Sequence, residues 1–508
     1  MNRSATMRVL SGIGLALAVL ATSGRAEDDA SKDQASSNDR VARLEARLAA
    51  QQQRIERLQE EVSATSRRDT EAARLDVMRR QIRELLSETE FRESLMQSTL
   101  QAGYEGGFFI RSSDEQFSML INGLLQFRWQ HYATRASNRY LNRGAQRDDR
   151  TGFDLARLRL DFSGNIHSKD WTYLIELEAD AADGYDFVLG EGWVNYAFSD
   201  AFNIKTGLFK AASTRSNLIG NGAMQFVDRP VVDAVYGLGF GVGIRFWGSL
   251  LDDRFDYFLD LLNSLGSGED FAIGRTITPD PAELDSNPAL VLRLVWHALG
   301  DEPGGDFADE GDLQMHESPA LDFGFHYAFN DDQGDALTTR IPFAAPRRFG
   351  SGGFGLTSTN GLQINQFGWD AAFKYQGFSA TGEYILRIVD PRRAGRRPFT
   401  PWWLATGADS TTVQHGAYVQ FGYFLPIPAL ENKLEAVARV GGISALSEGR
   451  AGTWEYAFGI NYYIDGNNIK LQTDVTKVSE SPISNPYTGL ANVNDDVLLF
   501  RVQLQVAF

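Results

Sequence analysis

Basic side chains occupy alternate positions in several short apolar stretches of the chain. Arg157 and Arg159 stand two residues apart in ARLRLDF, and Lys205 and Arg245 hold matching places in FNIKTGLF and GVGIRFWG. A charged group in the wall of a water-filled tube stays hydrated, so it costs little there and acts on passing ions through its field. The spacing therefore predicts a cationic strip that attracts anions without any covalent step.

Carboxylates share the same inward positions on the predicted strands. They are Glu176, Glu178, Asp180, Asp256, Asp370, Glu383 and Glu435. Two interpretations stay open from the residues alone. Either the basic residues form a selective path for anions, or the two signs pair across the lumen and line a general pore of mixed charge.

The sequence lacks the usual patterns for covalent or metal chemistry. It has 6 histidines without an HExxH spacing, no cysteine, and neither a GxSxG nor a Walker loop. GLGFGVG, at 237–243, alternates as a strand does, which argues against a dinucleotide loop. The acidic run 301–312 lacks the ligand spacing of a calcium loop, so we expect a solvated surface loop there. We therefore expect no enzyme activity, no cofactor and no bound metal.

A period of two dominates the chain after residue 107. The alternating stretches number about 16, an even count typical of barrels in bacterial outer membranes. Short turns, as at 164–170, alternate with long loops, as at 211–236, which is the expected difference between the two rims of a barrel. We predict an all-β transmembrane barrel over residues 107–508, with antiparallel strands and the final strand, VLLFRVQLQVAF, paired with the first.

The N-terminal part of the chain follows different rules. MNRSATMR, the apolar run VLSGIGLALAVLA and the small residues up to Ala26 have the order of a secretory signal peptide, assigned to residues 1–26. Residues 27–39 are polar and lack a hydrophobic period, which predicts a flexible linker. Apolar residues then recur at alternating three and four, which predicts a periplasmic coiled coil over residues 40–102. A single amphipathic helix lying on another domain is the alternative.

The chain resembles the phosphate-selective porin O and P family in FDLARLRLDFSGNI followed by WTYLIELE, in GLFKAASTRSNLIGNGAMQFVDRPVVDAVYG, and in ending on Phe508. The resemblance extends from about Gly107 to the C-terminus. It implies a trimeric outer-membrane barrel of sixteen strands, whose third loop folds into the lumen and forms the constriction. The matching loop is Ala211 to Tyr236. The implied constriction and anion-binding residues are Arg215, Arg229, Arg157, Arg159, Arg245 and Lys205.

These features predict an outer-membrane porin for the passive diffusion of small hydrophilic solutes, with anions such as phosphate as the expected solutes. The alternative is a structural anchor or tether whose coiled coil reaches toward peptidoglycan. The expected partners are further copies of the chain in a homotrimer, outer-membrane lipid, small anionic solutes and, for the tether, peptidoglycan. The formal net charge of -17 argues against nucleic acid as a partner.

Overall fold

The computed structural model describes residues 49–50, 52–57, 100–135, 149–179, 187–263, 265, 288–302, 304–332, 362–391, 412–430, 433–444, 452–481 and 496–508. The chain divides into two compact units, Met1–Ser98 and Thr99–Phe508. In the first unit, residues 49–50 and 52–57 are helical. The predicted signal peptide and linker, and most of the predicted coiled coil, lie outside the described residues. Within the described part, no helix has the length and apolar character needed to cross a membrane.

Eighteen strands make up most of the described part of the second unit, and each pairs antiparallel with the next along the chain. They are β1 (Leu100–Tyr104), β2 (Phe108–Ser112), β3 (Phe117–Arg135), β4 (Arg150–Ile166), β5 (Ser168–Ala179), β6 (Val188–Ser199), β7 (Phe202–Lys210), β8 (Phe240–Leu250), β9 (Phe255–Leu262), β10 (Ala289–Leu299), β11 (Ala320–Asp332), β12 (Leu362–Tyr375), β13 (Phe378–Pro391), β14 (Thr412–Phe424), β15 (Leu434–Ile443), β16 (Thr453–Asp465), β17 (Ile469–Ser479) and β18 (Asp496–Ala507).

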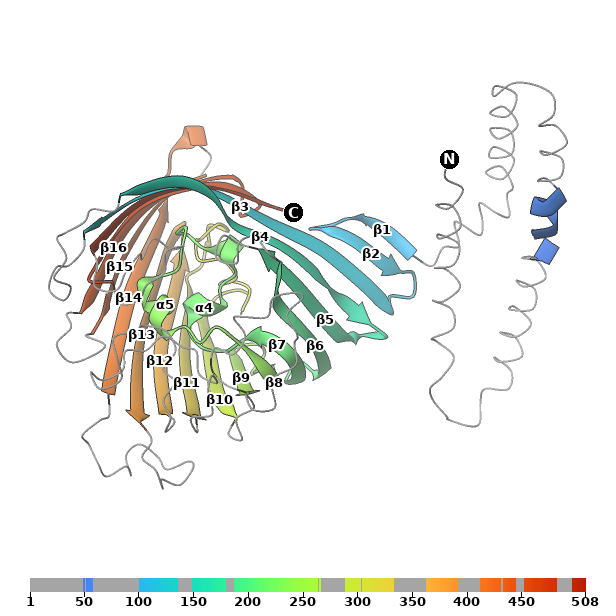
Figure 1. Ribbon diagram of the computed structural model, residues 1–508, viewed down its shortest axis with the longest axis horizontal. Helices are drawn as coiled ribbons and strands as arrows, with labels where there is room; N and C mark the ends of the chain where they lie inside the picture. The colour runs from blue at the N-terminus through green and yellow to red at the C-terminus, as the bar shows by residue number, and fades with distance from the viewer. Residues whose placement is uncertain are drawn as a thin grey trace, which may run out of the picture. The chain divides into compact units, whose positions relative to one another are not determined.

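Strands β3 to β18 close into a barrel of sixteen strands (Figure 1). The last strand, β18, pairs with β3 from Asp496 opposite Arg135 to Ala507 opposite Leu124. Because the first and last strands of the ring are hydrogen-bonded to each other, the wall avoids the open edge that a sheet cannot expose to hydrocarbon. The predicted fold class, strand number and closure are confirmed.

Burial in the barrel wall is the reverse of burial in a soluble sheet. Along β16 the outward side chains of Trp454, Tyr456 and Phe458 are more than half exposed, whereas the inward Glu455 and Asn461 are 2% and 1% exposed. Apolar surface gains about 25 cal/mol per Å² when it leaves water, so an outer face of this kind is stable only against hydrocarbon. The local alternation of the sequence thus sets both faces of the wall.

The connection from β7 to β8, residues 211–239, folds into the barrel (Figure 1). We call it the inner loop. Its valine-rich second helix packs against β13, β14 and β15 of the wall. The loop therefore folds into the lumen, as the family resemblance implied. The inner loop contains α4 (Arg215–Leu218), the 3-10 turn η1 (Asn221–Ala223) and α5 (Val231–Tyr236), and a further 3-10 turn, η5 (Pro428–Leu430), joins β14 to β15.

The connection from β10 to β11 also turns inward. We call residues 304–319 the second inner segment. Its Asp312 is fully buried, and the Glu310 carboxylate accepts a hydrogen bond from the backbone N–H of Gln225 in the inner loop, at 2.7 Å. The expectation of a solvated surface loop over the acidic run 301–312 is wrong. Its later carboxylates accept hydrogen bonds inside the barrel.

A hairpin of β1 and β2 precedes the barrel, and the sequence did not predict it. β2 pairs with the start of β3, from Phe108 opposite Ile121 to Arg111 opposite Ser118. Since β1 begins at Leu100, the predicted helical range 40–102 ends too late, and sheet structure begins before residue 107. The stretch is short and rich in glycine, so it lacks the long alternation that identified the other strands.

Candidate functional site

The first helix of the inner loop is held against the wall by an ion-pair cluster. Nε of Arg215 donates to Asp370 at 2.8 Å, and the same guanidinium reaches Asp322 at 3.4 Å. The backbone N–H groups of Arg215 and Ser216 both donate to the carboxylate of Glu383, at 2.8 and 2.7 Å. Arg215 thus acts as an anchor for α4, with its charge already compensated by the wall.

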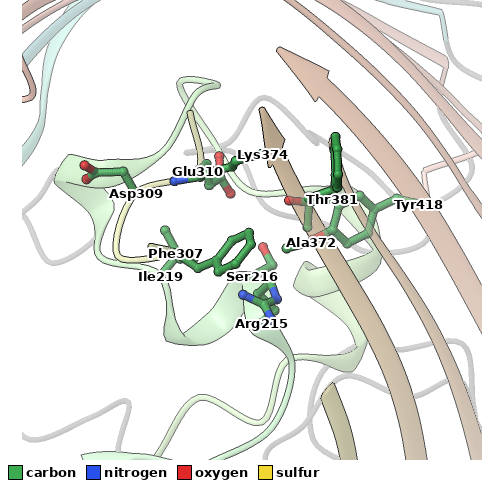
Figure 2. Close-up of a pocket in the computed structure, with 11 residues that line it drawn as sticks. Arg215, Ser216, Ile219, Phe307, Asp309, Glu310, Ala372, Lys374, Thr381 and Tyr418 are labelled. Atoms are coloured by element: carbon green, nitrogen blue, oxygen red, sulfur yellow. The ribbon is translucent and has the colours of Figure 1, made fainter. Parts of the chain in front are cut away.

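The second inner segment fills the space beside α4. Phe307 lies next to Ser216 and Arg215 in the close-up of this region (Figure 2). The Arg215 guanidinium and the Lys374 ammonium group each lie 5.4 Å from the centre of the Phe307 ring. A small cavity lies there, lined by residues that include Glu310. This side of the lumen is therefore occupied by protein.

Asp228 of the inner loop lies at the seam where β18 meets β3. Its carboxylate is ion-paired with Arg501 of β18, with Arg128 of β3 at 3.3 Å and with Arg157 of β4 at 3.6 Å. Burial by itself raises the pKa of Asp228, but these guanidinium charges outweigh burial and hold the pKa below its usual value. One loop carboxylate thus ties together three neighbouring strands around the closure of the barrel.

Two further arginines fix the shape and the base of the inner loop. The guanidinium of Arg229 donates to the backbone carbonyl oxygens of Ser216 and Ile219, at 2.8 and 2.6 Å. Nε of Arg245 donates to Asp260 at 2.6 Å, and Asp260 also accepts from a backbone N–H at the start of the loop. Both arginines are therefore committed to holding the loop in place.

On the inward wall of β4 to β7, some charged side chains keep contact with solvent. The side chains of Arg157 and Glu178 are 16% and 17% exposed, whereas Glu455 on the opposite wall is 2% exposed. Arg159 lies 3.1 Å from both Glu176 and Glu178. We therefore place the open part of the lumen between the inner loop and this wall.

Lys205 and Lys210 are basic residues of this open wall whose ammonium groups lack an ion pair within the described ranges. The ammonium group of Lys205 stands 3.9 Å from the centre of the Trp193 ring, whose indole N–H donates to Glu191 at 3.0 Å. The ammonium group of Lys210 interacts electrostatically with Arg229 and Glu191. The ammonium groups of the two lysines form no hydrogen bond or ion pair with a residue in the described ranges, so both are available to a solute.

The six residues implied for the constriction fall into two groups. Arg157, Arg159 and Lys205 lie on the partly exposed wall, and Arg229 stands close enough to Arg157 for their charges to interact. The other two, Arg215 and Arg245, are buried in ion pairs that hold the inner loop, so the structure does not bring all six together.

Sequence reasoning missed three residues that matter to this site. They are Lys210, Glu191 and Asp228. Lys210 is the last residue of the stretch FNIKTGLFK, where the strand ends and the loop begins. A basic residue at this position could have been predicted to lie beside the constriction. The partners of Asp228 lie up to 273 positions away along the chain, so no local pattern identifies them.

One family model matches part of the first half of the barrel. Residues 134–277 match the family model described as phosphate-selective porin O and P. That range runs from the end of β3 past β9, so it contains the open wall and the inner loop. The predicted resemblance is confirmed. No curated protein matches the chain.

Several solved structures are similar to the chain over most of its length. The anion-selective porin from Comamonas acidovorans has 8% identity and a TM-score of 0.49, covering 77% of this chain and 99% of that one. OprB of Pseudomonas putida has 10% identity and a TM-score of 0.46, with coverages of 76% and 94%. The outer membrane channel DcaP of Acinetobacter baumannii has 12% identity and a TM-score of 0.42, with coverages of 77% and 97%. Similarities at this level say nothing about the solute.

Proposed function

We propose that this chain is an outer-membrane porin through which small hydrophilic solutes, anions among them, diffuse passively. The observation that carries the proposal is the reversed burial of a closed ring, with apolar side chains outward and charged side chains inward. The family match over the inner loop supports the same function. Solutes pass between the inner loop and the wall of β4 to β7. Such a channel needs no covalent step, so we do not expect an enzyme.

Positive and negative charges on this open side are nearly balanced. The basic residues are Arg157, Arg159, Lys205, Lys210 and Arg229, and the acidic residues are Asp161, Glu176, Glu178, Glu191 and Asp228. Because the arginines contact carboxylates or loop carbonyls, the two lysines remain as the source of attraction for anions. This favours a pore of mixed charge with a moderate preference for anions over a path specific for phosphate.

We also propose that the barrel assembles as a homotrimer in the outer membrane, with the N-terminal unit in the periplasm. The support is the family match, together with a signal peptide and a coiled coil predicted from the sequence. Contact with peptidoglycan stays a prediction, as does the alternative role of a structural tether. A tether requires no ion path, whereas partly exposed lysines and acids inside the barrel favour one.

Replacing both lysines, Lys205→Met and Lys210→Met, is expected to lower the permeability of anions relative to cations. Methionine keeps the length of the side chain and removes its charge. The protein is reconstituted in planar bilayers under a salt gradient, and the reversal potential of the double variant should move toward that of an unselective pore. Lys433→Met, which removes an exposed ammonium group at the rim, is the matched control.

Two results would count against this account in different ways. If the double variant keeps the reversal potential of the wild type, the lysines do not set the preference for anions. If the wild type gives no steady current at all, the porin function itself is wrong and the tether is favoured.

A further inference from the structure

The open wall carries buried charged atoms of both signs that lack hydrogen-bond partners. They are Oε1 of Glu176, Oδ1 of Asp161 and Nε of Arg159, none of which finds a partner in the part of the chain that the structure describes. Glu176 and Arg159 are only 4% and 8% exposed. A buried polar group without a partner costs roughly 1 to 3 kcal/mol, so each of these atoms calls for a further binding partner.

The three atoms belong to one cluster on neighbouring strands. In the register of β4 and β5, Asp161 lies opposite Glu176, and Arg159 lies opposite Glu178. On the other side of Glu176, strand β6 has Gly190, and a side chain at that position would collide with the Glu176 carboxylate. Glycine at 190 therefore leaves the room that this carboxylate occupies.

Lys210 supplies a free positive charge to the same cluster. The charged groups that act on its ammonium group include Arg159, Glu191 and Glu176. Since the ammonium group of Lys210 has no hydrogen bond or ion pair among the described residues, an unpaired ammonium donor and unpaired carboxylate acceptors lie within one region of the wall.

We propose that this cluster is a subsite for solutes that carry one ammonium group and one carboxylate, as amino acids do. The ammonium group of the solute lies against the carboxylates of Asp161 and Glu176. The carboxylate of the solute accepts from Lys210. This inference rests on the proposed porin function and names a class of solute for it.

Solutes with a single charge fit the cluster less well. A simple anion that approaches Lys210 also meets the carboxylates of Asp161, Glu176 and Glu191, and a simple cation that approaches these acids meets Lys210 and Arg159. Like charges repel more strongly in a narrow, partly dry passage than in bulk water. A solute of both signs avoids this repulsion, because each of its ends faces the opposite charge.

Uptake of glycine and of glycolate into liposomes that contain the full-length protein tests the proposal. The two solutes differ only in whether an ammonium group or a hydroxyl group stands beside the carboxylate. Asp161→Asn keeps the size of the side chain and removes its charge. We expect glycine influx to fall about threefold relative to glycolate influx, the effect of losing one partly exposed ion pair.

Asp161→Glu, which keeps the charge, should retain the wild-type ratio of glycine to glycolate influx. The same holds for Asp170→Asn at the exposed start of β5, the matched control. An unchanged ratio in Asp161→Asn overturns the subsite and leaves the porin function intact. A wild-type protein that passes neither glycolate nor chloride overturns the porin function, and this inference with it.

Discussion

Asparagine in place of Asp228 is expected to destabilise the folded barrel strongly. The carboxylate compensates guanidinium groups on β18, β3 and β4 in a buried place. Removing one partner of a buried ion pair typically costs about 3 to 5 kcal/mol, because the other partner stays buried without compensation. Here the uncompensated groups lie on both sides of the seam that closes the barrel. The measurement is the temperature at which the protein in detergent loses its β-sheet circular dichroism.

The matched control for this prediction is Asp170→Asn, an amide substitution of a carboxylate that is exposed at the rim. Its transition should stay at the wild-type temperature. If Asp228→Asn also unfolds at the wild-type temperature, the seam does not depend on the inner loop, and the ion pairs at Asp228 contribute little.

Deleting residues 214–236 and joining the remaining ends with a short glycine linker is expected to raise single-channel conductance severalfold. The inner loop fills the lumen on the side of β11 to β17, so its removal exposes polar wall to water. Inward residues such as Gln420 and Arg439, now 2% and 4% exposed, would become hydrated and need no new partner. The measurement is the current through single channels at a fixed voltage and salt concentration.

A point substitution is expected to raise the conductance less than the deletion of the loop does. Glu383→Gln weakens the acceptor for the backbone N–H groups of Arg215 and Ser216 while leaving the loop complete. It should give a conductance that fluctuates between the wild-type level and higher levels. A loop deletion that retains sheet structure by circular dichroism but leaves the conductance unchanged would show that the inner loop does not limit the path.

The barrel could be predicted from the sequence because its main signal is local. Alternation of side chains between two faces is visible within one strand, as in β16, where Trp454 to Ile464 alternate outward apolar residues with inward small or polar ones. The number of strands and the closure follow from repeating that signal. The β1–β2 hairpin was not predicted, because each of its strands has only five residues and glycine interrupts the alternation.

The composition of the site could not be predicted to the same degree, because it depends on contacts between distant residues. Arg215 has the residue type of an anion ligand, yet its partners Asp370 and Asp322 lie 155 and 107 positions further along the chain. The acidic run 301–312 has the composition of a surface loop, and only the fold brings Glu310 to the inner loop. The sign of each charge can be read from the sequence, whereas the ion pair that compensates it depends on which distant residues the fold brings together.

Engineered cysteines test the central arrangement of the barrel most directly, since the natural chain has no cysteine. Lys205→Cys places a thiol on the open inner wall, and Phe458→Cys places one on the outer face of β16. In reconstituted membranes, a charged thiol reagent confined to water should modify Lys205→Cys and reduce the current. It should leave Phe458→Cys untouched, while a lipid-soluble reagent modifies that thiol. The opposite pattern, with the inner thiol unreactive and the outer thiol open to the charged reagent, would contradict a water-filled barrel surrounded by lipid.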